Sequence, residues 1–343
     1  MKGLQTPSAR HTYPPPPAAC VAGAAAGGRG YVRCSPAFRA ADPCVTLYSR
    51  SIPAAGTPDA RLQSMSLANL QPFAGQHAIQ SAALALDFSS ELDIGEVGRL
   101  RAAADLMKAE FPNIADQQRA MVQMAVGVGQ SGLPTTTMDA GGFVMERRPP
   151  SLLPSAIPPQ RSIIVNRESV IIVINDYTRW DKFKSDAERY LSSLLSSVNA
   201  QKAVASIGLQ INDVFLWKAD PADLDLAEVF AAKTPYLTPN VFSKDMLLWH
   251  SHHGYLKDEK SPAEHKQLTN INVARADVNG SQQLQILTSH KAIFARPLYK
   301  FLDANREKIA SVLDCLHLEN KRILGELLST ALQEKISLNK SKD

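Results

Sequence analysis

Four of the chain's eight histidines lie in one stretch of sequence, Met246–Leu268. If this stretch forms a β-strand, His250 and His252 project from the same face about 7 Å apart, and two imidazoles at that spacing can share a zinc ion. A catalytic zinc needs a third protein ligand, which would have to come from Asp258, Glu264, His265 or, across the sheet, His290. The hydrolase hypothesis takes His265 as this ligand and Glu264 as the general base. The cluster therefore raises the hypothesis of a metal-dependent hydrolase with zinc as its cofactor.

The alternative is that the same stretch is one strand of a sheet with a solvated face. In the segment that follows, Asn270 and Asn272 alternate with Ile271 and Val273, which is the pattern of an antiparallel strand with one wet face. A His-x-His pair is also a weaker metal signature than a HExxH helix or a CxxC pair. We therefore favour this second interpretation, in which Asn270 and Asn272 lie on a face that binds a partner.

The charge distribution gives no support for nucleic-acid binding. The chain has 343 residues and a net charge of +4. Residues 1–64 contain seven basic and two acidic side chains, so the rest of the chain is nearly neutral. A neutral body has no excess of cations to neutralise phosphates. The sequence also lacks the run of roughly 18 apolar residues that a membrane span requires, so we expect neither nucleic acid nor a membrane as a partner.

Residues 1–64 differ in composition from everything that follows. They are rich in Pro, Ala, Gly and Arg, show no apolar periodicity and hold three of the four cysteines. Such a composition cannot bury enough apolar surface to fold. We expect a disordered leader, or translated upstream sequence ahead of a true start at Met65, with an Arg-rich organellar transit peptide as the functional alternative. The one remaining cysteine, Cys315, fits a reducing, cytoplasmic compartment.

From Leu67 onward, strand-like and helix-like segments alternate. Strand patterns cover residues 78–88, 119–129, 141–148, 161–174, 204–217, 246–256, 268–278 and 284–295. Helical patterns cover residues 89–112, 178–198 and 298–336. Few helices against antiparallel sheets indicate an α+β protein in two comparable halves, residues 65–200 and 201–343, the second with a long terminal helical tract.

Local signals set several boundaries within this scheme. Ser89 or Ser90 is expected to cap the first helix. Hairpin turns are expected at residues 166–168 and at residues 279–280. The pair of glycines at residues 141–142 reads as the start of a strand.

The C-terminal tract keeps its apolar residues at helical spacing, except for a polar gap between Leu318 and Arg322. The gap predicts two consecutive helices or one bent helix. In the second part, Leu324 and Leu328 form a stripe that would bind a partner or a second copy if the domain leaves it uncovered. The alternative is that this stripe folds back onto the protein's own sheet. Cys315, in the first part, is expected to be a small buried side chain.

Three separate segments carry a resemblance to a known family. The first is a Tyr-x-x-Trp-x-x-Phe pattern made by Tyr177, Trp180 and Phe183, and the spacing of the last two also predicts core packing. The other matching positions are Gly208, Leu209 and Asn212 in a strand, and Leu316, His317, Ser329 and Thr330 in the terminal tract. Together these segments resemble a family of sporadically distributed bacterial proteins of unknown function. The chain has Gln210 and Ile211 where that family has Arg-Tyr.

The resemblance implies a bacterial intracellular protein but no particular reaction. We expect a non-enzymatic interaction or accessory protein whose open sheet face and terminal helix bind another protein or a second copy. A role in defence or toxin neutralisation is suggested only by analogy with the sporadic distribution of the family. The alternative remains the zinc-dependent hydrolase that uses His250, His252 and His265.

Overall fold

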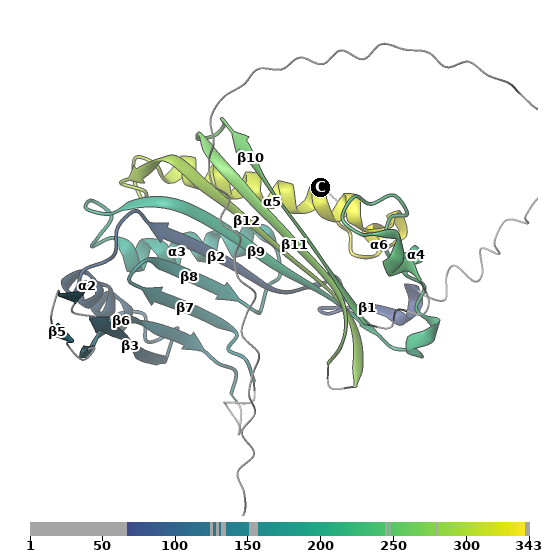
Figure 1. Cartoon of the computed structure of the whole chain (residues 1–343), viewed down its shortest axis with the longest axis horizontal. Helices are drawn as coiled ribbons and strands as arrows, with labels where there is room; N and C mark the ends of the chain where they lie inside the picture. The colour runs from purple at the N-terminus through teal and green to yellow at the C-terminus, as the bar shows by residue number, and fades with distance from the viewer. Residues whose placement is uncertain are drawn as a thin grey trace, which may run out of the picture. The chain divides into compact units, whose positions relative to one another are not determined.

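Antiparallel strands dominate the structure and form one large sheet whose helices lie on one face (Figure 1). The computed structural model describes residues 67–123, 126–127, 130–131, 135–150, 157–243, 246, 248–278 and 280–339. These residues belong to one compact unit. The predicted leader, residues 1–64, lies outside the described residues.

The elements follow the predicted alternation of strands and helices. The strands are β1 (Leu70–Pro72), β2 (Ile79–Phe88), β3 (Asn113–Gln123), β4 (Val126–Gly127), β5 (Gln130–Ser131), β6 (Thr135–Arg147), β7 (Arg161–Asn166), β8 (Ser169–Ile174), β9 (Ala203–Trp217), β10 (Trp249–Glu259), β11 (His265–Val278) and β12 (Ser281–Tyr299). The helices are α2 (Ile94–Asp105), α3 (Trp180–Leu195), α4 (Leu226–Val229), α5 (Arg306–Leu327) and α6 (Thr330–Lys335), with 3-10 turns η2 (Pro221–Asp223) and η3 (Pro239–Phe242). Within these ranges, no helix is both long and apolar enough to cross a membrane.

The sheet repeats one arrangement in its two halves. Its order is β10-β11-β12-β9-β2-β8-β7-β6-β3, and β1 also pairs with β9. The strands β2 and β9 pair at the centre, where Leu84 lies opposite Leu209. In each half the last strand returns to lie beside the first, β8 beside β2 and β12 beside β9, and a helix follows, α3 or α5. The antiparallel α+β architecture predicted from the sequence is confirmed.

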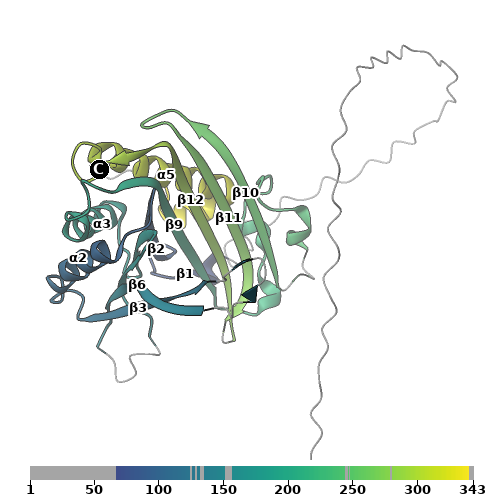
Figure 2. The same ribbon diagram turned by 60° about the vertical axis from the view of Figure 1, so that its left-hand side comes forward.

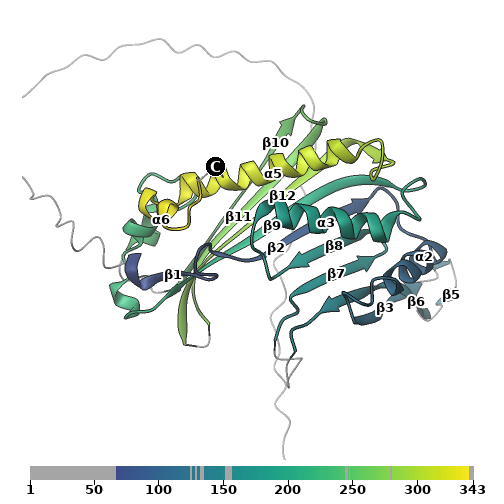
Figure 3. The same ribbon diagram turned by 180° about the vertical axis from the view of Figure 1, so that it is seen from behind.

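Alternation along the strands divides the side chains between the two faces of this sheet. In β2, Leu84 and Leu86 are buried, whereas Ala83 and Ala85 beside them are only half-buried. The buried set faces α3 and α5, which both lie in front of the sheet in Figure 3. Helix α5 contacts β9 and β12 and lies behind these strands in Figure 2. We call the opposite side, which none of the described helices covers, the open face.

Two apolar clusters lie beneath the helices, and a polar seam separates them. The first joins α3 to the first half of α5, and the second joins the last turns of α5 to α4 and α6. Between them the strands present Thr269, Thr288 and His290, all buried. The Thr288 hydroxyl donates to Asn320 on α5, and Thr269 hydrogen-bonds the His290 ring at 3.1 Å. These hydrogen bonds satisfy polar groups that the helix removes from water.

The polar gap in the terminal tract corresponds to this seam and not to a break in the helix. Helix α5 continues without interruption from Arg306 to Leu327, and Glu319 and Asn320 within the gap are buried. The helix ends at Leu328, after which Ser329 caps α6 by accepting from the N–H of Leu332 at 3.3 Å. The predicted break at residues 318–322 is therefore wrong, because a polar helical residue can face a buried polar partner as well as solvent.

Other local expectations also need correction. Helix α2 is capped by Asp93, whose carboxylate accepts from the N–H of Glu96 at 2.7 Å, while Glu96 accepts from the N–H of Asp93 at 2.8 Å. This reciprocal capping box lies several residues beyond Ser89 and Ser90, the predicted caps. Cys315 is exposed, so the expectation of a buried cysteine is wrong. The hairpin predicted at residues 166–168 is present between β7 and β8. In the hairpin predicted at residues 279–280, Asn279 lies outside the described residues.

Candidate functional site

The structure does not bring the three predicted zinc ligands together. His250 and His252 are exposed on the open face, where His252 hydrogen-bonds the Asn272 side chain. His265 lies opposite Glu259, on the helix-covered face, and its ring Nδ1 contacts the carbonyl of Ala263 at 2.7 Å. Glu259, the residue paired with His265, is seven positions along β10 from His252. His252 and His265 are therefore roughly 23 Å apart. These three side chains cannot hold one ion.

Other His, Cys, Asp and Glu side chains of the described residues form no alternative metal site. Within the described ranges, no group of three His, Cys, Asp or Glu side chains is placed to hold a metal ion. The hairpin that joins β10 to β11 explains why His265 is far from His250 and His252 and on the other face of the sheet. Its register pairs even-numbered residues of β10 with even-numbered residues of β11, and odd-numbered with odd-numbered. The histidine spacing in the sequence gives no information about that register.

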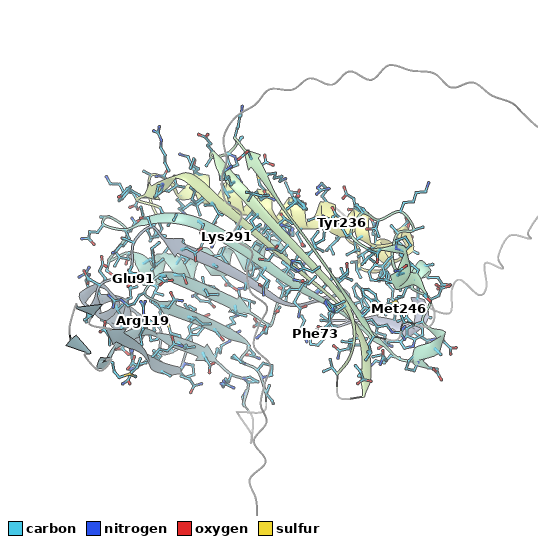
Figure 4. The ribbon with its side chains drawn as sticks, in the orientation of Figure 1. Phe73, Glu91, Arg119, Tyr236, Met246 and Lys291 are labelled. Atoms are coloured by element: carbon cyan, nitrogen blue, oxygen red, sulfur yellow. The ribbon has the colours of Figure 1, made fainter. Side chains whose placement is uncertain are left out.

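Asn270 and Asn272, the predicted partner-binding asparagines, do lie on the open face and are half-buried there. Leu268 and Leu256 pair on the same face, and Leu256 is 55% exposed. Lys291, labelled near the middle of the sheet in Figure 4, forms an ion pair on this face with Asp87 at 2.8 Å. The open face is therefore a mixed aliphatic and amide surface.

Leu324 and Leu328, the other predicted partner-binding residues, are not on a surface. Their exposed fractions are 3% and 1%, and both belong to the second apolar cluster. The stripe that they form folds back onto the protein's own sheet, so it offers nothing to a partner or a second copy.

A pocket of about 750 Å³ lies at the end of the polar seam, where β9, α3, α5 and α6 meet. It is lined by residues that come from five places in the sequence: the turn before β2, the start of α3, the strand β9, the middle of α5 and the end of α6. Its volume is in the range of small-molecule sites, roughly 300–1,000 Å³. We call it the Asp213 pocket.

Asp213 lines this pocket from β9. It shares the helix-covered face with Ile211 and Phe215, and its exposed fraction is 3%. Its Oδ2 atom is buried and has no hydrogen-bond partner among the described residues. Burial alone raises the pKa of Asp213 to about 7. A buried carboxyl group without a partner is costly, because desolvation is not repaid by a hydrogen bond.

Aromatic rings form one wall of the pocket. The Trp180 indole stacks on the His317 imidazole with ring centroids 4.0 Å apart and an interplanar angle of 5°. The indole N–H donates to Asp314 at 3.0 Å, which fixes the ring at the start of α3. His77 meets Tyr177 edge to face at 5.5 Å. All four rings line the pocket.

Burial shifts the pKa values of two titratable side chains in this wall, His317 and Tyr177. Burial lowers the pKa of His317 to about 4, and the positive charge of Lys321 lowers it further. The His317 Nδ1 atom is buried and unpartnered within the described part of the chain. Burial raises the pKa of Tyr177, and the negative charges of Asp213 and Asp181 add to this effect. At neutral pH the side chains of Tyr177 and His317 are therefore uncharged. The pocket lining contains three buried polar atoms without hydrogen-bond partners among the described residues, one each on His77, Asp213 and His317.

The prediction from sequence named part of this wall without recognising it as a site. Tyr177, Trp180 and His317 were chosen for a family resemblance, from segments far apart in sequence, and they line one pocket. Trp180 is half-buried: it packs against the core cluster, where its ring stacks on His317 and Phe183, and it also lines the pocket. Asp213 was missed. The sequence did contain a signal for Asp213. This acidic residue lies two positions after Ile211 and two before Phe215, so in a strand it shares their apolar face.

No protein-family model matches the chain, and no curated protein matches it.

Proposed function

We propose that this protein is a binding protein that holds a small organic cation in the Asp213 pocket. The observation that carries the proposal is the buried, unpartnered Oδ2 atom of Asp213. A ligand that donates from an ammonium or guanidinium group would supply the missing hydrogen bond and a compensating charge. Neither is provided by any side chain of the described structure.

The aromatic wall favours a cationic ligand over a neutral ligand that only donates a hydrogen bond. Tyr177 lines the same pocket as the carboxyl group and has only edge-on or tilted contacts with other rings, and cations are attracted to the face of such a ring. The stacked His317 is uncharged at neutral pH, so it does not repel a cation. Carboxylate and aromatic faces together are the groups that recognise ammonium ions in proteins.

The proposal predicts binding that depends on the ionised form of Asp213. Phenethylamine, which carries an ammonium group and a flat ring, is expected to bind the full chain, with affinity rising between pH 6 and pH 8 as Asp213 ionises. Asp213→Asn is expected to lose about tenfold or more in affinity at pH 8. Isothermal titration calorimetry measures both.

The control is Asp258→Asn, which neutralises an exposed carboxylate on β10 whose ion-pair partner among the described residues is Lys266. This variant is expected to bind phenethylamine as the parent does. Equal binding by the parent and Asp213→Asn, or no binding by either at pH 8, contradicts the proposal.

A second candidate function is docking of another protein on the open face, as an accessory or interaction protein would do. The exposed aliphatic side chain of Leu256, which pairs with the half-buried Leu268 on the adjacent strand, supports it. A photo-crosslinking residue in place of Leu256 is expected to give a discrete adduct in the native host. The same residue in place of Arg99, exposed on α2, serves as control. Identical adducts at the two positions would count against a specific interface.

A further inference from the structure

The start of α3 forms one side of the Asp213 pocket. Residues 177–181 line it, and α3 begins at Trp180. The N-cap residue is Arg179, whose side chain accepts no hydrogen bond from the first turn. The 16-residue helix α3 therefore receives no capping hydrogen bond from its N-cap side chain, and the first-turn N–H groups of a helix attract anions.

Two cations lie at the same place. Arg179 and Lys321 both line the pocket, and neither has an ion-pair partner within the described ranges. Lys335, a third cation of the lining, is already engaged, because its ammonium group donates to the carbonyls of Leu67 and Leu70. Asp181 in the first turn of α3 carries the one opposing charge of this rim.

The pocket therefore has two regions of opposite character. Its floor is a buried carboxyl group without a partner, and its rim combines an uncapped helix N-terminus with two cations. We infer that the ligand is a zwitterion whose ammonium group binds Asp213 and whose carboxylate or phosphate binds at the start of α3, beside Arg179 and Lys321. This inference rests on the proposed function, since it assigns the amine to the same carboxylate.

An amino acid or a related amine that bears an anionic group has the required chemistry. A simple amine would make only the contact with Asp213. The added anionic group gains charge-assisted hydrogen bonds from the helix and the two cations. The zwitterion should therefore bind more tightly than the amine that lacks the anion.

The test compares matched pairs of probes on the full chain at pH 8 by calorimetry. Phenylalanine is compared with phenethylamine, and 6-aminohexanoate with hexylamine, so that two separations between the charges are sampled. In at least one pair the zwitterion is expected to bind about tenfold more tightly. The double variant Arg179→Met, Lys321→Met should lose this advantage while it binds the amine within about twofold of the parent.

Lys308→Met provides the matched control, because Lys308 is an exposed cation on α5 outside the pocket lining. It should retain the full advantage of the zwitterion. If amines and zwitterions bind equally and both need Asp213, the anion site is overturned and the proposed cation site stands. If no probe binds, both are overturned. If the double variant still binds the zwitterion more tightly than the amine, the anionic group binds elsewhere. That result also overturns the inference.

Discussion

Asp213→Asn is expected to abolish a loss of stability that the parent protein suffers as the pH rises from 4 to 8. The folded-state pKa of Asp213 is about 7, against an ordinary value of 3.8. Below pH 3.8 both states carry the proton. Between 3.8 and 7 only the folded state keeps it, so unfolding releases a proton and the free energy of unfolding falls with rising pH. Above pH 7 the loss is complete, at roughly 4 kcal/mol.

Other titrating groups face Asp213 and must be separated from it. They come from every element around the pocket: His77, Tyr177, Arg179, Asp181, His317, Lys321 and Lys335. His317 has its pKa lowered to about 4, so it makes the folded state more favourable as pH rises from 4 to 6.5, which is the opposite direction. Because the parent and the variant share these groups, their contributions largely cancel in the difference between the two proteins.

Urea denaturation of the parent and Asp213→Asn at pH 5 and pH 8 measures that difference. Relative to the parent, the variant is expected to gain roughly 3 kcal/mol between these pH values. A difference that stays constant with pH would show that Asp213 ionises in the folded protein near its ordinary pKa. In that case the carboxylate already has a partner, and it does not need a bound cation to supply one.

The sequence is informative where one period repeats over many residues. Helix α3 buries Phe183, Ala187, Tyr190 and Leu194, as its spacing predicts, because a 3.6-residue period survives whatever the helix packs on. Strand alternation similarly identifies the face of β11 that holds Ile271 and Val273. These patterns are local, so they fix fold class and element type.

Interactions between segments are what the sequence does not provide. The spacing of His250 and His252 says nothing of where His265 falls, because the loop between β10 and β11 decides the register. In α5, Asn320 looks solvent-exposed until Thr288 from β12 is placed against it. Asp213 becomes a candidate only when α3 and α5 are seen to cover its strand without supplying a partner. The site depends on packing of distant elements, which no single-segment pattern contains.

Gly142→Ala is expected to destabilise the fold by about 3 kcal/mol or more. The pair Gly141 and Gly142 lies inside β6 and not at its start, at a bulge where the pairing with β3 shifts register. Gly142 has φ +134°, a conformation that L side chains rarely adopt. A Cβ atom there would lie 1.9 Å from the carbonyl oxygen of Val165 on β7.

The clash cannot be relieved cheaply, because the oxygen belongs to the backbone of a neighbouring strand. Moving it would disturb the pairing of Gly142 with Asn166, which holds β6 to β7. Gly98→Ala is the matched control: Gly98 is exposed in the middle of α2, and an added Cβ meets nothing within 4 Å. There the same change should stabilise by roughly 0.5–1 kcal/mol, because alanine favours a helix over glycine. If both variants unfold at the parent's urea midpoint, Gly142 does not pack closely against the Val165 backbone, and the bulge in β6 does not have the geometry described.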